Sequence, residues 1–491
     1  MRLINYIRLL RLWWLLLFIV GFQLFAAAQS KTDNVERLLR REMQERRIPG
    51  LQIAVVQDEK IILLKSFGMA DVQNSVPVTD KSIFAINSCT KAFTGVAIMQ
   101  LVEDGKLDLS APVSRYLDGL PSEWQPVTIR QLLTHVSGLP NLLRVLDPIT
   151  NGFGSGLNEE VVWTKVKLMP MEFPTGERFS YNQTNYALLG KIIDKLSGKP
   201  FAQMFTERQF QIAKMPNTGF GDSRDVVPNM AQTYRWVKSL DGQKFSEDKL
   251  TNNYAEFPPF RRTASGINST AEDLARWIMA LQQGKLLKTQ IALNTLWTAG
   301  AYNNGEPSQW ALGWVTKPRP KHSAVIATGG GRAAFFVYPE DDLAIVVLTN
   351  LAGAFPEEFI DELAGIYNPE ISASDSVTAL RMELRERGYE RAVEVYQELK
   401  KKNPNFQPLE KDLNDWAYRM LNGGGKPKEA LEIFKLNVFV YPMSANVYDS
   451  VAEAYAANGF RELAIKNYKR SLELDPKNTN AVQQLKKLGS W

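Results

Sequence analysis

The fold and the chemistry are both decided by a segment that reads Phe84-Ala85-Ile86-Asn87-Ser88-Cys89-Thr90-Lys91-Ala92-Phe93-Thr94-Gly95. An apolar stretch from Ala92 to Asp104 follows it and predicts a helix with Ser88 at its start. Ser88 and Lys91 then lie one helical turn apart. A buried lysine has a lowered pKa and can take the proton of a serine hydroxyl. The spacing predicts a serine nucleophile with a lysine base, although an S-x-x-K match alone also arises by chance.

The composition excludes several other kinds of site. The 491 residues include one cysteine, Cys89, and two histidines, His135 and His322. One cysteine rules out an internal disulfide and a cysteine-rich zinc site. The chain has no H-E-x-x-H motif, no phosphate-binding loop and no G-x-S-x-G elbow. We therefore expect no metal and no other cofactor, and a catalytic base that is not histidine.

The first 28 residues have the pattern of a signal peptide. Arg2, Arg8 and Arg11 precede an apolar run that ends in Ala26-Ala27-Ala28. Cleavage after about Ala28 would give a periplasmic or secreted protein, and retention of the segment as an anchor stays open. Removal of three arginines and no acids lowers the net charge from +5 to +2. This charge does not favour nucleic-acid binding, and we expect no membrane span beyond the signal segment.

Residues 30–367 are predicted to form one α+β domain. Runs 51–57 and 60–68, split by Asp58-Glu59, predict a β-hairpin. Runs 333–337 and 343–348 are also strand-like, and helical stretches lie between the two pairs. Strands at both ends of the domain predict an antiparallel sheet built from both ends and flanked by helices.

The last part of the chain, residues 374–491, is predicted to be a helical repeat domain. Gly425, Ala430, Phe434 and Pro442 recur 34 residues later as Gly459, Ala464, Tyr468 and Pro476. This period resembles that of tetratricopeptide repeats, which bind extended peptides on a concave face. An unrelated helical bundle is the alternative. A protein or peptide partner for the repeats is expected on the first interpretation.

The context of the S-x-x-K segment resembles the β-lactamase-related serine hydrolases. This group includes class C β-lactamases, D-alanyl-D-alanine carboxypeptidases, D-aminopeptidases and esterases. The matching blocks are residues 84–95, 103–109, 128–140, 181–190, 265–274, 312–314 and 328–331. The resemblance implies a β-lactamase/transpeptidase-like fold with an antiparallel sheet and an all-helical part. It also implies that Tyr181 relays protons between Ser88 and the leaving group, with a charged Lys91 to support its phenolate form.

The resemblance also implies an oxyanion hole and substrate contacts. The oxyanion donors would be the backbone N–H groups of Ser88 and Gly330, and Thr328 and Gly329 would line the substrate strand. Gln183 stands where relatives have asparagine, and it is expected to bind a substrate carbonyl at altered reach. Ala327 stands where relatives often have lysine or histidine, which argues against an efficient β-lactamase. Arg332 is a candidate to replace that charge, although on a strand it would point to the opposite face.

The expected function is that of a secreted serine hydrolase that acts through an acyl-enzyme on a small-molecule or peptide substrate. An ester, an amide or a D-amino-acid peptide bond is favoured over a lactam because of Ala327. His135, Cys89 and the tryptophans Trp310 and Trp314 are interpreted mainly as packing residues. The alternative hypothesis is a low-turnover scaffold with the same fold that binds partners through its repeats.

Overall fold

A computed structural model describes residues 30–145, 158–241, 244–422 and 425–490. The predicted signal peptide lies outside the described residues. The chain divides into two compact units, Met1–Leu363 and Ala364–Trp491, and each is considered by itself. Within the described ranges, we find no helix with the length and apolar character that a membrane crossing requires.

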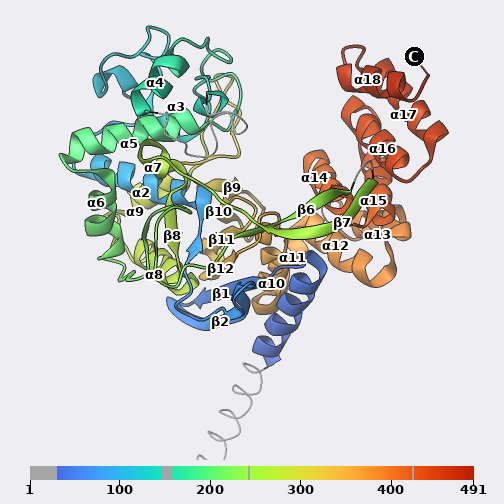
Figure 1. Cartoon of the computed structure of the whole chain (residues 1–491), viewed down its shortest axis with the longest axis horizontal. Coiled ribbons are helices and arrows are strands. Elements are labelled where there is room, and N and C mark those ends of the chain that lie inside the picture. Colours follow the sequence, from blue (N-terminus) through green and yellow to red (C-terminus); the bar gives the residue numbers. More distant parts are fainter. Residues whose placement is uncertain (1–29, 146–157, 242–243, 423–424, 491) are drawn as a thin grey trace, which may run out of the picture. The chain divides into compact units, whose positions relative to one another are not determined.

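The first unit is built on a seven-stranded sheet with the order β3-β2-β1-β12-β11-β10-β9. The hairpin β1 (Gly50–Gln57) and β2 (Lys60–Asp71) forms as predicted. Asp58 and Glu59 both adopt positive φ, which is the turn geometry that suits the twist of a two-residue hairpin. β1 also pairs antiparallel with β12 (Leu343–Thr349), so both ends of the domain meet in one sheet, as Figure 1 shows. The predicted α+β class is confirmed.

The remaining strands extend this sheet or form small ones. The other members of the large sheet are β3 (Val76–Pro77), β9 (Val315–Lys317), β10 (Ala324–Gly329) and β11 (Ala333–Tyr338). A three-stranded sheet holds β4 (Phe84–Ala85), β8 (Ile267–Ser269) and β5 (Gly219–Phe220). A separate hairpin consists of β6 (Tyr234–Asp241) and β7 (Lys244–Asn252).

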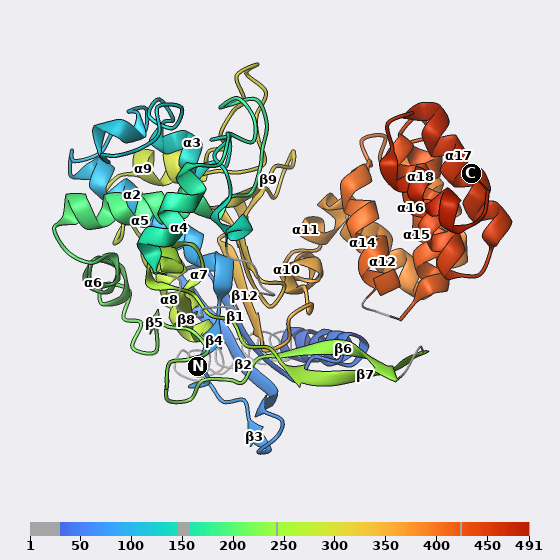
Figure 2. The same ribbon diagram turned by 45° about the horizontal axis from the view of Figure 1, so that its top comes forward.

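Helices cover the sheet and form a helical part of their own (Figure 2). The chain is helical over residues 30–46, before β1. The labelled helices of this unit are α2 (Thr90–Glu103), α3 (Ile129–Leu133), α4 (Glu159–Lys167), α5 (Gln183–Ser197), α6 (Phe201–Phe205), α7 (Arg262–Ser265), α8 (Ala271–Gln282) and α9 (Gln290–Trp297). α8 packs on β1, β2 and β12, whereas α5 and α7 pack on α2.

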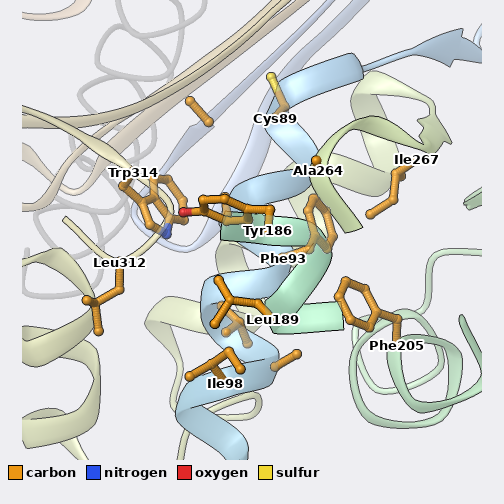
Figure 3. Close-up of a cluster of buried hydrophobic side chains, with 14 of the residues drawn as sticks. Cys89, Phe93, Ile98, Tyr186, Leu189, Phe205, Ala264, Ile267, Leu312 and Trp314 are labelled. Atoms are coloured by element: carbon orange, nitrogen blue, oxygen red, sulfur yellow. The ribbon is translucent and has the colours of Figure 1, made fainter. Parts of the chain in front are cut away.

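The central helix α2 is buried along nearly its whole length, from Thr90 to Leu101. A helix that is apolar on all sides is typical of the middle of a core. Figure 3 shows Phe93 and Ile98 on α2 facing the core that also holds Tyr186 and Leu189 from α5. The ring of Phe93 stacks on Trp277 with centroids 3.9 Å apart. This packing fixes the position of the helix that carries Lys91.

Two glycine positions let neighbouring backbone approach α2 closely. A Cβ on Gly95 would lie 2.0 Å from the carbonyl oxygen of Leu312. Gly313 has a φ of +91°, and a Cβ there would lie 2.2 Å from the carbonyl oxygen of Lys91. The loop at residues 312–314 therefore rests directly on the start of α2 and helps to hold it in place.

The second unit is helical. Its elements are α10 (Ile360–Tyr367, which crosses the boundary), α11 (Pro369–Ser374), α12 (Ser376–Arg387), α13 (Ala392–Lys402), α14 (Glu410–Asn422), α15 (Pro427–Val440), α16 (Ala445–Ala457), α17 (Arg461–Leu474) and α18 (Thr479–Lys487). α15 and α17 begin 34 residues apart, as do α16 and α18. Ala430 and its counterpart Ala464 are both fully buried. The assignment of these helices to the tetratricopeptide class stays a prediction.

Candidate active site

Ser88 lies in a single 3-10 turn, Asn87–Cys89, that leads directly into α2. The turn is held between α7, which packs against it, and the end of β10. Asn87 has a φ of +46°, a left-handed conformation that is uncommon for a residue other than glycine. Such local strain is often found where the fold must present a reactive group. Ser88 itself is partly exposed, while its neighbours Asn87 and Cys89 are buried.

Lys91 is fully buried beneath Ser88. Its Nζ lies 3.3 Å from Oγ of Ser88, 3.2 Å from Oε1 of Gln183 and 2.8 Å from the carbonyl oxygen of Ala264. Burial lowers the pKa of Lys91 well below its ordinary value, and repulsion from the Arg261 guanidinium lowers the pKa further. No carboxylate is among the three Nζ contacts, so none of them restores the charged form.

A neutral Lys91 fits these three contacts well. A neutral amine has two N–H donors and one lone pair, and Ala264 and Gln183 supply two oxygen acceptors for the donors. As the structure stands, Nζ donates to Oγ of Ser88, and on loss of one proton its lone pair could accept from the Ser88 hydroxyl instead. The arrangement thus places an amine of lowered pKa in contact with the Ser88 hydroxyl.

Tyr181 lies next to this pair. Nζ of Lys91 is 4.6 Å from the centre of the Tyr181 ring. Burial raises the pKa of Tyr181 to about 12, although interactions of its phenol with the Ser88 and Gln183 side chains lower it. The phenol is therefore protonated at neutral pH. This argues against the expectation that a charged Lys91 supports a Tyr181 phenolate, because burial disfavours the charge on both groups.

The ring of His135 packs against the ring of Tyr181. The two ring centroids are 4.6 Å apart, and Trp310 packs on both rings. Nδ1 of His135 accepts a hydrogen bond from the backbone N–H of Asn182 at 3.1 Å. Burial lowers the pKa of His135 well below its ordinary value, so the ring is neutral. The packing interpretation of this residue agrees with its position.

Gln183 contacts Lys91 rather than open space. It is 5% exposed, and its Oε1 accepts the hydrogen bond from Nζ of Lys91. The sequence predicted that this amide binds a substrate carbonyl. The structure gives its Oε1 a lysine partner, and the substrate contact of this amide stays a prediction.

The end of β10 approaches the Ser88 turn closely. A Cβ on Gly329 would lie 1.9 Å from the carbonyl oxygen of Ile86 and 3.1 Å from the nitrogen of Ser88. Gly330 follows at a φ of +59° and is exposed. Among the described residues, neither the Ser88 N–H nor the Gly330 N–H donates a hydrogen bond. Both N–H groups therefore have no acceptor within the described part of the protein and stand beside the same serine.

The other predicted substrate residues differ in their placement. Thr328 is partly exposed near the end of β10, in line with its predicted role. Arg332 is 3% exposed and lies in the turn between β10 and β11, so the expectation that it stands on a strand is wrong. Within the described ranges, no hydrogen bond or ion pair joins Arg332 to Ser88, Lys91 or Tyr181. Ala327 is buried in the hydrophobic core.

Sequence reasoning missed two contributors to the site. The carbonyl oxygen of Ala264 is the shortest contact of the Lys91 amine, and Arg261 acts electrostatically on both Lys91 and Tyr181. A backbone carbonyl has no sequence signature. Arg261 is one of two adjacent arginines, and nothing in their pattern shows which of them enters the site.

Cys89 points away from the site. It is fully buried, its Sγ contacts the carbonyl oxygen of Ala333 at 3.6 Å, and burial raises the pKa of its thiol well above the ordinary value. A buried protonated thiol is a poor nucleophile. Its interpretation as a small core residue agrees with this placement.

The comparisons with known proteins agree with this geometry. The chain is 26% identical over 340 residues to protein flp of Staphylococcus aureus (strain MW2), with 67% of this chain and 65% of that protein covered. The octameric penicillin-binding protein homologue from Pyrococcus abyssi is 26% identical at a TM-score of 0.56, with 68% of this chain and 76% of that chain covered.

A third protein of known structure is similar to this chain in its fold alone. The D-amino acid amidase from Ochrobactrum anthropi SV3 is 23% identical at a TM-score of 0.57, with 70% of this chain and 98% of that chain covered. The chain spans 65% of the length of the flp protein, so it does not match the whole of that relative. The family model described as beta-lactamase matches residues 35–365, which hold every active-site residue named above. The chain therefore belongs to the beta-lactamase family.

Proposed function

We propose that the protein is a secreted serine hydrolase that forms an acyl-enzyme on Ser88. The observation that carries the proposal is the contact of 3.3 Å between the amine of a fully buried Lys91 and the Ser88 hydroxyl. In the acylation step the Ser88 oxygen attacks the substrate carbonyl while Lys91 takes the hydroxyl proton. Tyr181, which is protonated at neutral pH before the reaction, donates its proton to the leaving group and regains one from Lys91. Water then releases the acyl group by the reverse route.

The oxyanion formed on the substrate carbonyl would be held by the N–H groups of Ser88 and Gly330. Both donors are free, and the close approach of Gly329 to the Ser88 turn holds them near one another. Fixed donors of this kind stabilise the transition state because they need no reorganisation during the reaction.

Gly329→Ala should disrupt this arrangement. The new Cβ would overlap the Ile86 carbonyl, which is backbone and cannot move aside without separating β10 from the Ser88 turn. We expect a loss of about 1–3 kcal/mol in the free energy of unfolding and of about 100-fold in kcat. Chemical denaturation and steady-state ester hydrolysis measure the two effects. Gly219→Ala is the control, because no atom lies within 4 Å of its Cβ position. Equal behaviour of the two variants would contradict the proposed role of Gly329.

Esters, amides and D-amino-acid peptides are favoured over lactams as substrates. Ala327 lies in the hydrophobic core, so the strand offers no charged side chain at that position. The test is a hydrolysis panel of short-chain esters, D-amino-acid amides and a chromogenic cephalosporin, with the Ser88→Ala variant in parallel. The proposal expects Ser88-dependent turnover of an ester or an amide at a higher kcat/KM than that of the cephalosporin. Failure to hydrolyse every ester and amide would overturn it.

The pH dependence of kcat/KM tests the assignment of Lys91 as the base. The rate requires neutral Lys91, so it should rise with pH through the lowered pKa of that amine and level off well below pH 10.5, the ordinary value for lysine. It also requires protonated Tyr181, whose pKa of about 12 predicts no alkaline fall in the neutral range. The profile of an uncharged ester measures this. A rise centred on the ordinary pKa of lysine would contradict the assignment.

A further inference from the structure

Arg261 stands at the active site without a partner for its charge. It ends the 3-10 turn Pro259–Arg261, which packs on α5, and it lies three residues before Ala264, whose carbonyl holds Lys91. Its Nε is buried and has no hydrogen-bond partner, although the residue as a whole is partly exposed. In the described part of the chain, no hydrogen bond or ion pair of its guanidinium is found. Its one recorded side-chain contact is with the Phe257 ring, 5.2 Å from Cζ.

The neighbouring Arg262 shows what a structural arginine looks like in this segment. Its Nε donates to the carbonyl oxygen of Phe257, and its Nη2 lies 3.4 Å from Asp222 and 3.1 Å from Asp225. Acidic side chains thus neutralise the guanidinium of Arg262, whereas no such partner of Arg261 is found in the described part of the chain. Burial of an arginine without a counter-ion raises the free energy of the folded state, which suggests that the charge has a function.

A substrate anion is the partner that fits this position. The turn that ends in Arg261 packs on α5 and α7, which hold Gln183 and Ala264 against Lys91, and the charge of Arg261 acts on Lys91 and Tyr181. The planar guanidinium matches a carboxylate with two parallel hydrogen bonds. The beta-lactamase family position at Ala327 carries no charge here, so Arg261 is the available cation beside Ser88, Lys91 and Tyr181 among the described residues. Arg332, by contrast, is not among the charges that shift the pKa of Lys91.

We propose that Arg261 is an anion-binding residue of this site and selects esters or amides that carry a carboxylate close to the scissile bond. The inference rests on the proposed function, because it names the substrate class of the same Ser88 site. The terminal nitrogens of Arg261, which are not among the buried polar atoms without a partner, would be the donors to the carboxylate.

The first test compares matched esters. Mono-para-nitrophenyl adipate carries a carboxylate on the acyl side, and its methyl ester is the neutral match. Meta-acetoxybenzoate carries a carboxylate on the leaving-group side, and methyl meta-acetoxybenzoate is its neutral match. We expect the wild-type protein to favour one of the two acids over its methyl ester by about tenfold or more in kcat/KM. The acid that is favoured shows on which side of the scissile bond the anion lies.

Three variants separate the role of Arg261 from a general effect of charge. Arg261→Gln should remove the preference, so that its kcat/KM for the favoured acid falls to about that for the matched methyl ester. Arg261→Lys should keep part of the preference, because it keeps the charge and loses the planar fork. Arg178→Gln is the control, since Arg178 is an exposed arginine close in sequence to Tyr181. All rates are compared on the alkaline plateau of each pH profile.

A second readout would not move if Arg261 were merely structural. The groups recorded as acting on Lys91 are Ser88, Cys89, Tyr181, Gln183, Tyr186, Arg261 and His135. Of these, Arg261 carries a positive charge near neutral pH. Its removal should therefore shift the acidic limb of the profile for a neutral ester to higher pH, because the repulsion that lowers the pKa of Lys91 is lost.

Binding to the Ser88→Ala protein decides the inference without relying on turnover. Titration calorimetry should give tighter binding of the favoured acid than of its methyl ester, and Ser88→Ala/Arg261→Gln should lose the difference. Equal binding of acid and methyl ester by the Ser88→Ala protein would overturn the role of Arg261. Absence of Ser88-dependent hydrolysis for all four esters, with binding selectivity retained, would instead count against the proposed hydrolase and not against the anion site.

Discussion

Replacing Ser88 with alanine should lower kcat for the best ester or amide substrate by about 10³-fold or more. The substitution removes the oxygen that forms the acyl-enzyme and leaves the Lys91 amine, the Tyr181 phenol and the oxyanion donors in place. The Ser88 side chain is partly exposed and forms a hydrogen bond with Lys91. We therefore expect its loss to have little effect on the stability of the fold. Steady-state kinetics and thermal unfolding of both proteins measure the two effects.

Cys89→Ala is the matched control for this experiment. Cys89 lies in the same 3-10 turn, one position further on, and its thiol is buried against Ala333. Its loss should leave kcat within about threefold of the wild-type value and cost about 1 kcal/mol of stability. If Cys89→Ala abolished turnover while Ser88→Ala did not, the nucleophile would be the thiol and the account of this site would be wrong.

Lys91→Met should slow acylation by about 10²- to 10⁴-fold, the usual contribution of a general base. Methionine has an unbranched side chain of similar length that can fill the buried position of Lys91, and it has no amine. The Ser88 hydroxyl then loses the group that accepts its proton. Stopped-flow measurement of the acylation burst isolates this step from the release of the acyl group.

The pH profile gives this variant a second, independent result. The acidic limb that we attribute to Lys91 should be absent from Lys91→Met. Lys106→Met is the control, because Lys106 is an exposed lysine three residues beyond the end of α2. An acidic limb that survives in Lys91→Met would assign the titration to another group and contradict the role of this amine.

Much of the fold could be predicted because its strands, turns and helices depend on local sequence patterns. The two apolar runs on either side of Asp58-Glu59 formed the expected hairpin, and the apolar stretch after Ser88 formed α2. The shared sheet of both chain ends followed from the strand-like runs at residues 333–337 and 343–348. Each of these rests on periodicity and turn chemistry, which are properties of neighbouring residues.

The charge states in the site could not be predicted in the same way. The Ser-x-x-Lys spacing predicted a buried Lys91 with a lowered pKa, whereas the family resemblance implied a charged Lys91 beside a Tyr181 phenolate, and burial of both side chains favours the first expectation. Burial of a group in the middle of a domain depends on elements distant in sequence, here α5 and α7. The same holds for Gln183, whose amide oxygen contacts Lys91 across 92 positions of sequence.

Arg261 and Arg332 show why charged candidates were hard to choose from the sequence. Arg332 follows three glycines of a recognised block, which drew attention to it, yet Gly330 and Gly331 both adopt positive φ and turn the chain before it. Arg261 belonged to no motif, yet its charge acts on Lys91 and Tyr181. A free guanidinium is recognised only when its possible partners have been placed.

Labelling with a fluorophosphonate tests the central claim most directly. The probe forms a covalent bond to a serine oxygen only when a neighbouring base activates it and donors stabilise the charged intermediate. The account predicts that the wild-type protein is labelled on Ser88, that Ser88→Ala is not labelled and that Lys91→Met is labelled much more slowly. Peptide mass spectrometry identifies the modified residue. A wild-type protein that stays unlabelled, or a label that persists in Ser88→Ala, would contradict the account.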